Sequence, residues 1–256
     1  ERKRRRKLLI KSGVVVQHPD GSLEAVSPEM AERHLAAMSP EVGARYEEEV
    51  RGWDGVMQSW YVDEWQDRGL FLEATFTPLA FGSHWLPGAG EAFKERIENF
   101  DRLGAIGVHL SDRSRGRIGF KRGRPRITYG LIAEDAAAIG FGIARAADIH
   151  FAAGASEVYT HIGSLPPLTP GQTESIEWER VRPRDLRLEA FHPMGTARMG
   201  KDPDGCVVAP TGETHEIPGL HVADASIFPT SLRVNPMITI MACARRIAAS
   251  LANRLA

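Results

Sequence analysis

The chain has 256 residues, of which 43% are hydrophobic and 25% charged, and its formal net charge is −1. This mixture is typical of one large or two ordinary globular domains, and the near-zero charge indicates no particular partner for the chain as a whole. The only two cysteines, Cys206 and Cys243, exclude a disulfide framework and a zinc site, so we expect no metal and, from the reducing compartment they favour, a cytoplasmic protein.

Residues 1–7 (ERKRRRK) contain six basic side chains. Such a segment can bind nucleic acid or anionic lipid or direct targeting, and more often it is simply solvated. No aromatic residue is interleaved with the basic ones, so we expect no nucleic-acid partner. The apolar LLI that follows is far too short for an export signal, and no apolar run approaches the roughly 18 residues of a membrane span.

The first quarter of the chain contains turn and helix-start signals. Residues 8–16 and 22–26 predict two short strands around a His-Pro-Asp-Gly turn. Two Ser-Pro-Glu triplets predict helices over 27–38 and 39–50, because each pairs a cap residue with Pro at the first helical position. Aromatic residues are then dense between 51 and 65, which is typical of packing between layers or of a pocket wall.

A sheet and a helix are predicted in the middle of the chain. Residues 70–79 begin with the alternation of a half-buried strand, and 91–103 have the apolar period of a helix. Three strand-like pieces follow and are joined by short polar turns. They predict an antiparallel meander over 105–110, 117–121 and 126–130.

The last half of the chain begins with a helix from Glu134, ended by Gly154, and a strand over 156–162. Further strands are predicted at 207–210 and 220–224. Asn235 and Pro236 are a natural N-cap and first residue for the final helix. Its predicted apolar stripe contains eight residues: Met237, Ile240, Met241, Ala244, Ile247, Ala248, Leu251 and Leu255.

Several familiar motifs are absent from the sequence. There is no G-x-G-x-x-G between a strand and a helix, no Walker loop, no HExxH and no G-x-S-x-G. His215 and His221 have no third metal ligand beside them in the sequence, so we interpret both as packing or surface histidines.

The loop 191–200 and the start of the last helix predict a reactive site. His192 lies between Pro- and Gly-rich turns and can take a proton from a hydroxyl near neutral pH. A helix N-terminus stabilises an anion, Asn235 adds an amide, and Asp224 ends a predicted strand. This set suits the oxidation of an alcohol with a flavin as acceptor. In the alternative interpretation, His192 is an ordinary loop histidine and Asn235 only a helix cap.

The segments HPMGTARMG (192–200) and VADASIFPTSLRVNPMIT (222–239), followed by an Ala-rich helix, resemble the C-terminal signature of the glucose–methanol–choline (GMC) family of FAD-dependent oxidoreductases. The resemblance is dense over about the last 65 residues and weaker over 127–159, and its wording is closest to the bacterial and long-chain-alcohol-oxidising branch. It does not cover residues 1–50.

The resemblance implies specific roles. His192 matches the family's catalytic base, which assists hydride transfer to flavin N5, and Asn235 matches its second active-site position. Two groups of residues match cofactor-binding positions of the family: Asp224 and Ala225 beside the ribityl and pyrophosphate of FAD, and Pro236, Met237 and Thr239 at the helix start beside the flavin ring.

The resemblance also implies an α+β organisation. Residues 51–219 would form a substrate-binding domain, with an antiparallel sheet flanked by helices and the active-site loop 191–200. Residues 220–256 would return as a strand and helix to a Rossmann-like FAD domain, and 1–50 stay unassigned. Because the glycine-rich FAD-binding half is not in this sequence, we expect a second chain to supply it in a hetero-oligomer. The alternatives are a cleaved or split product and a truncated gene.

The substrate is expected to be an apolar or aromatic alcohol, because aromatic residues that could form a pocket wall are frequent: Trp53, Trp60, Tyr61, Trp65, Phe71, Phe76, Phe81 and Trp85. The alternative function is a non-catalytic interaction subunit or a decayed fragment of the same fold.

Overall fold

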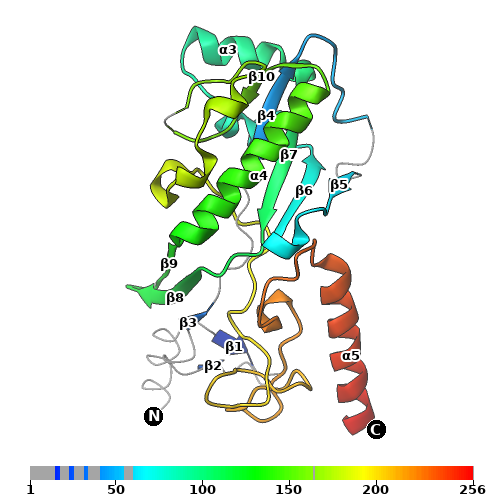
Figure 1. The fold of residues 1–256 in the computed structure, drawn as a ribbon. Helices are drawn as coiled ribbons and strands as arrows, with labels where there is room; N and C mark the ends of the chain where they lie inside the picture. Colours follow the sequence, from blue (N-terminus) through cyan, green and yellow to red (C-terminus); the bar gives the residue numbers. More distant parts are fainter. Residues whose placement is uncertain are drawn as a thin grey trace. The chain divides into compact units, whose positions relative to one another are not determined.

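The computed structural model describes residues 15–17, 23–25, 32–33, 41–54, 60–163 and 165–255 (Figure 1). The chain divides into two compact units. Unit 1 comprises Glu1–Ala37, Ser111–Leu131 and Ala190–Ala256, and unit 2 comprises Met38–Leu110 and Ile132–Glu189. Among the described residues, no helix combines the length and apolar character needed to cross a bilayer.

Unit 2 is built on a five-stranded antiparallel sheet in the order β10-β4-β7-β6-β5. The order places β7, the longest of these strands, at the centre. The strands are β4 (Glu41–Tyr46), β5 (Tyr61–Val62), β6 (Leu70–Thr75), β7 (Leu103–Leu110) and β10 (Ala155–Tyr159).

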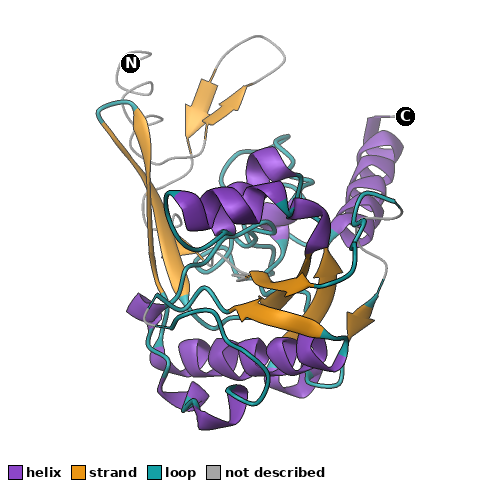
Figure 2. Ribbon diagram, turned by 90° about the horizontal axis from the view of Figure 1, so that it is seen from above, coloured by secondary structure: helices purple, strands orange, loops and turns teal. Residues whose placement is uncertain are grey.

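One face of this sheet is covered by α4 (Ala133–Ala152), as Figures 1 and 2 show. Alternate residues of the strands point to this face, and Val42, Leu72 and Val108 are buried there. Gly142 lets the helix approach closely, because a Cβ added there would lie 2.5 Å from a methyl group of Val108. The helix was predicted from the apolar face that includes Ile139, and this prediction is confirmed.

Short helices complete unit 2. They are α2 (Leu79–Gly82), α3 (Glu91–Glu98) and 3-10 turns at Gln66–Arg68, Ser83–Trp85, Phe100–Arg102, Thr173–Ser175, Trp178–Arg180 and Pro183–Asp185.

Unit 1 contains a β1–β2 hairpin, a three-stranded sheet in the order β3-β8-β9, and the last helix, α5. The β1–β2 hairpin agrees with the turn predicted between 16 and 22. The element bounds are β1 Val15–Gln17, β2 Leu23–Ala25, β3 Glu32–Arg33, β8 Arg115–Lys121, β9 Arg124–Gly130 and α5 Met237–Leu255.

The two helices predicted over 27–38 and 39–50 are wrong in the described residues, which form β3 and β4 instead. Val42 and Ala44 are fully buried with period two. β4 is paired on both edges, with β10 and β7. Pairing and burial in the middle of a sheet outweigh a local helix-start signal.

The meander predicted over 105–130 is also wrong. β7 pairs with β4 and β6 in unit 2, whereas β8 and β9 form a hairpin in unit 1. The four residues 111–114 therefore connect two different sheets. Asp112 there accepts a hydrogen bond from the Tyr129 hydroxyl, which ties this connection to β9.

No strand forms at 207–210 or 220–224, where the described chain has only isolated bridges such as Val208 with Met199 and Glu213 with His221. A strand needs a neighbouring edge, and the described residues provide none for more than single pairs here. The parallel, Rossmann-like part of the predicted fold is therefore not seen, while the mixture of helices with an antiparallel sheet is.

The helix α5 forms as predicted, but its apolar stripe is placed only in part. Ile247 is buried, and Ile240 packs against the same core. Met237 and Met241, assigned to the stripe, are exposed by 63% and 52%. The helix is rich in Ala and apolar on several sides, so the helical period alone did not identify the buried side.

The compact units do not coincide with the predicted segments 51–219 and 220–256. Residues 111–131 and 190–219 group with α5 in unit 1. The assignment of these segments to substrate or cofactor stays a prediction.

Candidate functional site

The loop that carries His192 is held against the turn at 225–228. The backbone N–H of Ala197 donates to the carbonyl of Ser226 at 2.9 Å, and that of Met199 donates to the carbonyl of Ile227 at 2.7 Å. These bonds connect the two sequence segments that predicted the site, although almost 30 residues separate them.

A small hydrophobic core beneath the loop joins it to α5. Met194 and Ala197 come from the loop, Ile227 and Phe228 from the turn, and Ile247 from the helix. Each is at least nine-tenths buried. The loop and the final helix are therefore anchored on one common core.

Both predicted active-site residues lie close in the sequence to buried residues. His192 is half-buried and lies two residues before the buried Met194. Asn235 is half-buried and directly precedes Pro236, which is buried. The anchoring of their neighbours limits how far either side chain can move, which a site for proton transfer requires.

Two glycines permit close packing at and after the loop. A Cβ at Gly200, the last residue of the loop, would collide with the sulfur of Cys206. Gly212, which follows the loop, has a φ of +84°, and its missing Cβ leaves room for Ile247, 2.6 Å from where that atom would be. Gly200 thus provides space, and Gly212 provides both space and backbone conformation.

Polar groups brace the same loop. Arg198 Nε donates to the carbonyl of Gly205 at 2.7 Å, and His215 Nε2 lies 3.0 Å from the carbonyl of Gly200. The ring of His221 bonds to the carbonyl of Gly219 through Nδ1. Both histidines therefore have local structural roles, as the sequence interpretation expected.

Asp224 occupies a helix cap instead of a strand end. Its carboxylate accepts a hydrogen bond of 2.8 Å from the backbone N–H of Ser226, at the start of the 3-10 turn Ala225–Ile227. The residue is exposed. A carboxylate fixed at a turn and open to solvent suits hydrogen bonding to a ribose-like or ribityl hydroxyl.

The N-terminus of α5 has the chemistry that a flavin ring requires. Its first helical bond runs from Ile240 N to Pro236 O at 2.8 Å, so the amides of 237–239 have no acceptor within the helix. Met237 and Ile238 beside them are exposed by 63% and 68%. Donors next to exposed apolar side chains fit a flat heteroaromatic ring with acceptor oxygens.

The predicted aromatic wall does not form a single surface in the described residues. Trp65 packs edge-on against Phe141 of α4 at 5.7 Å, and Trp85 packs against His161 at 5.0 Å. Trp60 is 80% exposed. The aromatic residues fill separate gaps between elements, which is their usual role, and the side chain of Phe81 lies outside the described part of the chain.

Sequence reasoning missed a polar pair in unit 2. Glu73 and His109 project from β6 and β7 on the sheet face away from α4, with 3.5 Å between a carboxylate oxygen and the ring Nε2. Both are largely buried, with His109 against the Phe71 ring. The alternation of β6 suggested that Glu73 faces solvent, because a strand pattern shows the two faces but not what covers them.

A second buried histidine has a structural explanation. In His150 of α4, Nε2–H donates to the carbonyl of Val42 at 2.9 Å, and Nδ1 accepts from the Tyr46 hydroxyl at 2.8 Å. Burial lowers the pKa of His150 to about 4, against a smaller opposing effect of the Val42 carbonyl. The ring is therefore neutral at physiological pH and links α4 to β4.

Comparison with known proteins identifies a family for this chain. The family model described as GMC oxidoreductase matches residues 112–244. An uncharacterized GMC-type oxidoreductase of Mycobacterium tuberculosis is 34% identical over 218 residues, which are 84% of this chain and 35% of that protein. Long-chain-alcohol oxidase FAO4A of Arabidopsis thaliana is 39% identical over 161 residues, 59% of this chain and 22% of its own length.

A solved structure shows the same fold. The formate oxidase of Aspergillus oryzae RIB40 superposes with a TM-score of 0.62 at 16% identity, covering 90% of this chain and 49% of that chain. This chain thus spans about a third of the mycobacterial relative and about half of the oxidase. The family match covers the His192 loop, the 225–228 turn and the start of α5, and the chain belongs to the GMC oxidoreductase family.

Proposed function

We propose that this chain supplies the substrate-binding and proton-handling part of an FAD-dependent enzyme that oxidises an alcohol. The observation that carries the proposal is the common core beneath the His192 loop and α5. It holds a candidate base and a helix N-terminus on one support, in a chain of a family whose relatives include long-chain-alcohol oxidases.

His192 serves as the base that takes the proton from the substrate hydroxyl. Asn235 hydrogen-bonds the same oxygen and orients it, so that the carbon-bound hydrogen points toward the acceptor. FAD, when bound, accepts that hydrogen as hydride. Imidazole is the side chain most often used for such a proton transfer near pH 7.

The cofactor contacts assigned to this chain are of two kinds. At the N-terminus of α5, which follows Pro236, the backbone amides of Met237 and Thr239 would donate to the carbonyl edge of the flavin. Asp224 and Ala225 would border its ribityl and pyrophosphate part. The partial positive charge of a helix start stabilises an anion by about 0.3–1 kcal/mol at an exposed site.

The adenosine part of FAD is held, in this proposal, by a glycine-rich segment outside these 256 residues, on a second chain or another segment. Two observations support it. The sequence contains no G-x-G-x-x-G between a predicted strand and a helix. In addition, an apolar surface is exposed at the start of α5, formed by Val234, Met237, Ile238 and Met241. Covering such a surface is favourable by roughly 25 cal/mol per Å².

The proposed substrate is an apolar alcohol. The support is the relation to FAO4A, which is a long-chain-alcohol oxidase by name.

The test uses this chain co-expressed with the FAD-binding portion of the mycobacterial relative. We expect the flavin absorbance band only with both parts, and oxidation of a long-chain alcohol by the assembly. His192→Ala should lower kcat by at least about 10²-fold through loss of the base, with flavin content unchanged. Asn235→Ala should lower kcat less, since Asn235 only orients the oxygen.

His215→Ala is the matched control, because its ring braces the same loop without belonging to the proposed reaction. If His192→Ala and His215→Ala reduce turnover equally, His192 has no special role. A flavin-containing isolated chain would overturn the need for a second part. An assembly that binds flavin but oxidises no alcohol would favour the non-catalytic alternative.

A further inference from the structure

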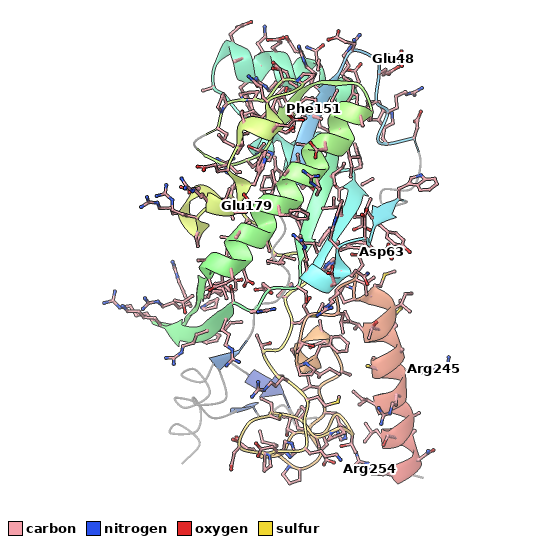
Figure 3. All side chains as sticks on the ribbon, viewed as in Figure 1. Glu48, Asp63, Phe151, Glu179, Arg245 and Arg254 are labelled. Carbon is pink, nitrogen blue, oxygen red and sulfur yellow. The ribbon has the colours of Figure 1, made fainter. Side chains whose placement is uncertain are left out.

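The β8–β9 ribbon of unit 1 is strongly basic. Residues 113–126 contain seven basic side chains and no acidic one. The two strands are joined by a two-residue turn in which Arg122 and Gly123 have φ of 53° and 77°, as a tight hairpin turn requires. In Figure 3, side chains ending in nitrogen project from this hairpin.

The pairing register sorts these charges onto one face. Residues directly opposite each other in an antiparallel pair share a face, and neighbours along a strand alternate. One face is formed by the pairs Arg115–Gly130, Arg117–Thr128, Gly119–Arg126 and Lys121–Arg124. Five basic side chains therefore share a face on which Thr128 is the only neutral side chain beyond glycine.

The other face of the ribbon is apolar. It is formed by the pairs Gly116–Tyr129, Ile118–Ile127 and Phe120–Pro125. Ile127 is 62% exposed, and Pro125 next to the turn is exposed as well. The ribbon thus combines a cationic face with exposed apolar side chains near its tip.

The cationic face has little countercharge. Within the described part of the chain, no carboxylate pairs with Arg115, Lys121, Arg124 or Arg126, and all four are exposed. Lys121 lies directly opposite Arg124, a like-charge arrangement that destabilises a hairpin. Arg117 differs from these four residues, because its backbone is paired with that of Glu32 in β3.

An open hollow of about 510 Å³ lies at the base of this face. Arg115, Arg117 and Arg198 border it, together with Thr128 and Tyr129. The guanidinium groups of these arginines match the oxygen atoms of a phosphate group, which they bind in pairs. The hydroxyls of Thr128 and Tyr129 already donate to the Arg117 carbonyl and to Asp112.

We propose that the basic face of the β8–β9 ribbon docks on an anionic phospholipid membrane, and that the hollow takes the phosphate of one lipid headgroup. A flat row of cations suits a flat array of phosphates, and the apolar tip suits the boundary between headgroups and acyl chains. Nucleic acid fits less well. Phe120 is on the opposite face, and the Tyr129 hydroxyl is bonded to Asp112, so the basic face offers no row of free aromatic rings for stacked bases.

This inference rests on the ribbon, and the proposed function adds only that an apolar alcohol accumulates in membranes. Its test involves no turnover, so the two proposals can fail separately. The full chain is incubated with vesicles of phosphatidylcholine, alone or mixed with phosphatidylglycerol, and the bound fraction is measured by sedimentation over a range of salt concentrations. We expect binding only to the anionic vesicles, weakening as salt rises.

The ribbon variant combines Arg115→Gln, Lys121→Gln, Arg124→Gln and Arg126→Gln. We expect it to bind anionic vesicles on the order of 10²–10³-fold more weakly, from the usual effect of one basic residue at a membrane surface. The control variant removes the same charge elsewhere, with Gln at four exposed basic positions that pair with carboxylates: Arg51, Lys94, Arg180 and Arg184. Its binding should change less than about 3-fold, since these pairs are already neutralised.

Four results would overturn the proposal. The first is equal loss of binding in the ribbon and control variants. The second is loss of binding only when the six basic residues of 1–7 are replaced by Gln. The third is tighter ribbon-dependent binding to duplex DNA than to vesicles at the same salt. Displacement from vesicles by inorganic phosphate, at an ionic strength matched with chloride, would also overturn it by assigning the hollow to free phosphate.

Discussion

The buried histidine of α4 makes the stability of unit 2 depend on pH in a direction that can be calculated. The His150 pKa is about 4 in the folded chain and about 6.5 when the chain unfolds. Below pH 6.5 the unfolded state binds a proton that the folded state does not. The free energy of unfolding therefore falls as pH falls from about 6.5 to about 4, and levels off below that.

The size of this effect follows from the two pKa values. Between pH 7.5 and pH 4.5 the linkage relation gives a loss of about 2.5 kcal/mol from His150 alone. No discount for solvent screening is applied, because the ring is buried and only 3% exposed. A loss of this size is a large part of the 5–15 kcal/mol typical of a domain.

The assay uses the natural tryptophans. All five, at positions 53, 60, 65, 85 and 178, belong to unit 2, so their fluorescence reports the unfolding of that unit. Urea unfolding is measured at several pH values for the unchanged chain and for His150→Gln. Carboxylates titrate in both proteins, so the difference between the two curves isolates His150.

We expect His150→Gln to lower stability at pH 7.5 and to lose this disadvantage by pH 4.5. Tyr46→Phe removes one hydrogen bond to the ring but leaves it buried, so its curve should keep the pH dependence of the unchanged chain. Parallel curves for the unchanged chain and His150→Gln would refute the reasoning, since they would mean that the ring titrates alike in both states.

Two glycine substitutions test the packing of the two units. Gly212→Ala should destabilise unit 1 by about 2–4 kcal/mol, because it adds backbone strain at φ +84° to a collision with Ile247; helix circular dichroism should then melt before tryptophan fluorescence. Gly219→Ala is the control, with a φ of +82° and open space around its Cβ, and should cost only about 1–2 kcal/mol. Gly142→Ala should lower the stability of unit 2 by about 1–3 kcal/mol, because the added methyl group overpacks against Val108. Urea unfolding followed by tryptophan fluorescence measures this loss. An unchanged unfolding midpoint would mean that α4 can shift away from the sheet.

The elements predicted best from the sequence are those in which the spacing of apolar residues itself identifies the buried side. In α4, Ile139 and Ile143 recur at helical spacing and are fully buried in the structure. The Asn-Pro pair was likewise sufficient to predict the start of α5, and the alternation of apolar residues was sufficient to predict β6. β4 was missed because it is short and its burial comes from β7 and β10, which lie far away in sequence. No local signal contains that information.

The candidate site shows the same division. His192, Asp224 and Asn235 were singled out from their loop, strand-end and helix-cap context, and the family resemblance then implied their roles. The bonds from Ala197 and Met199 to the 226–227 turn depend on tertiary structure. The partnership of His150 with Tyr46 spans 104 residues, and nothing in either local sequence indicated it. Buried polar pairs of this kind become visible only when strand register and helix packing are known.

The basic ribbon shows why net charge was a poor guide to partners. The chain has 32 basic and 33 acidic residues, so its sum is close to zero whatever their arrangement. What a surface recognises is local, and the face on which each charge lies depends on register. A shift of one residue in the β8–β9 pairing would move Arg124 and Arg126 to the face of Ile118 and Phe120 and divide the charges between both sides. A single residue inserted after Gly123 should therefore weaken binding to anionic vesicles although net charge and composition of the basic residues are unchanged. Undiminished binding by that insertion variant would mean that the number of charges matters and their alignment on one face does not.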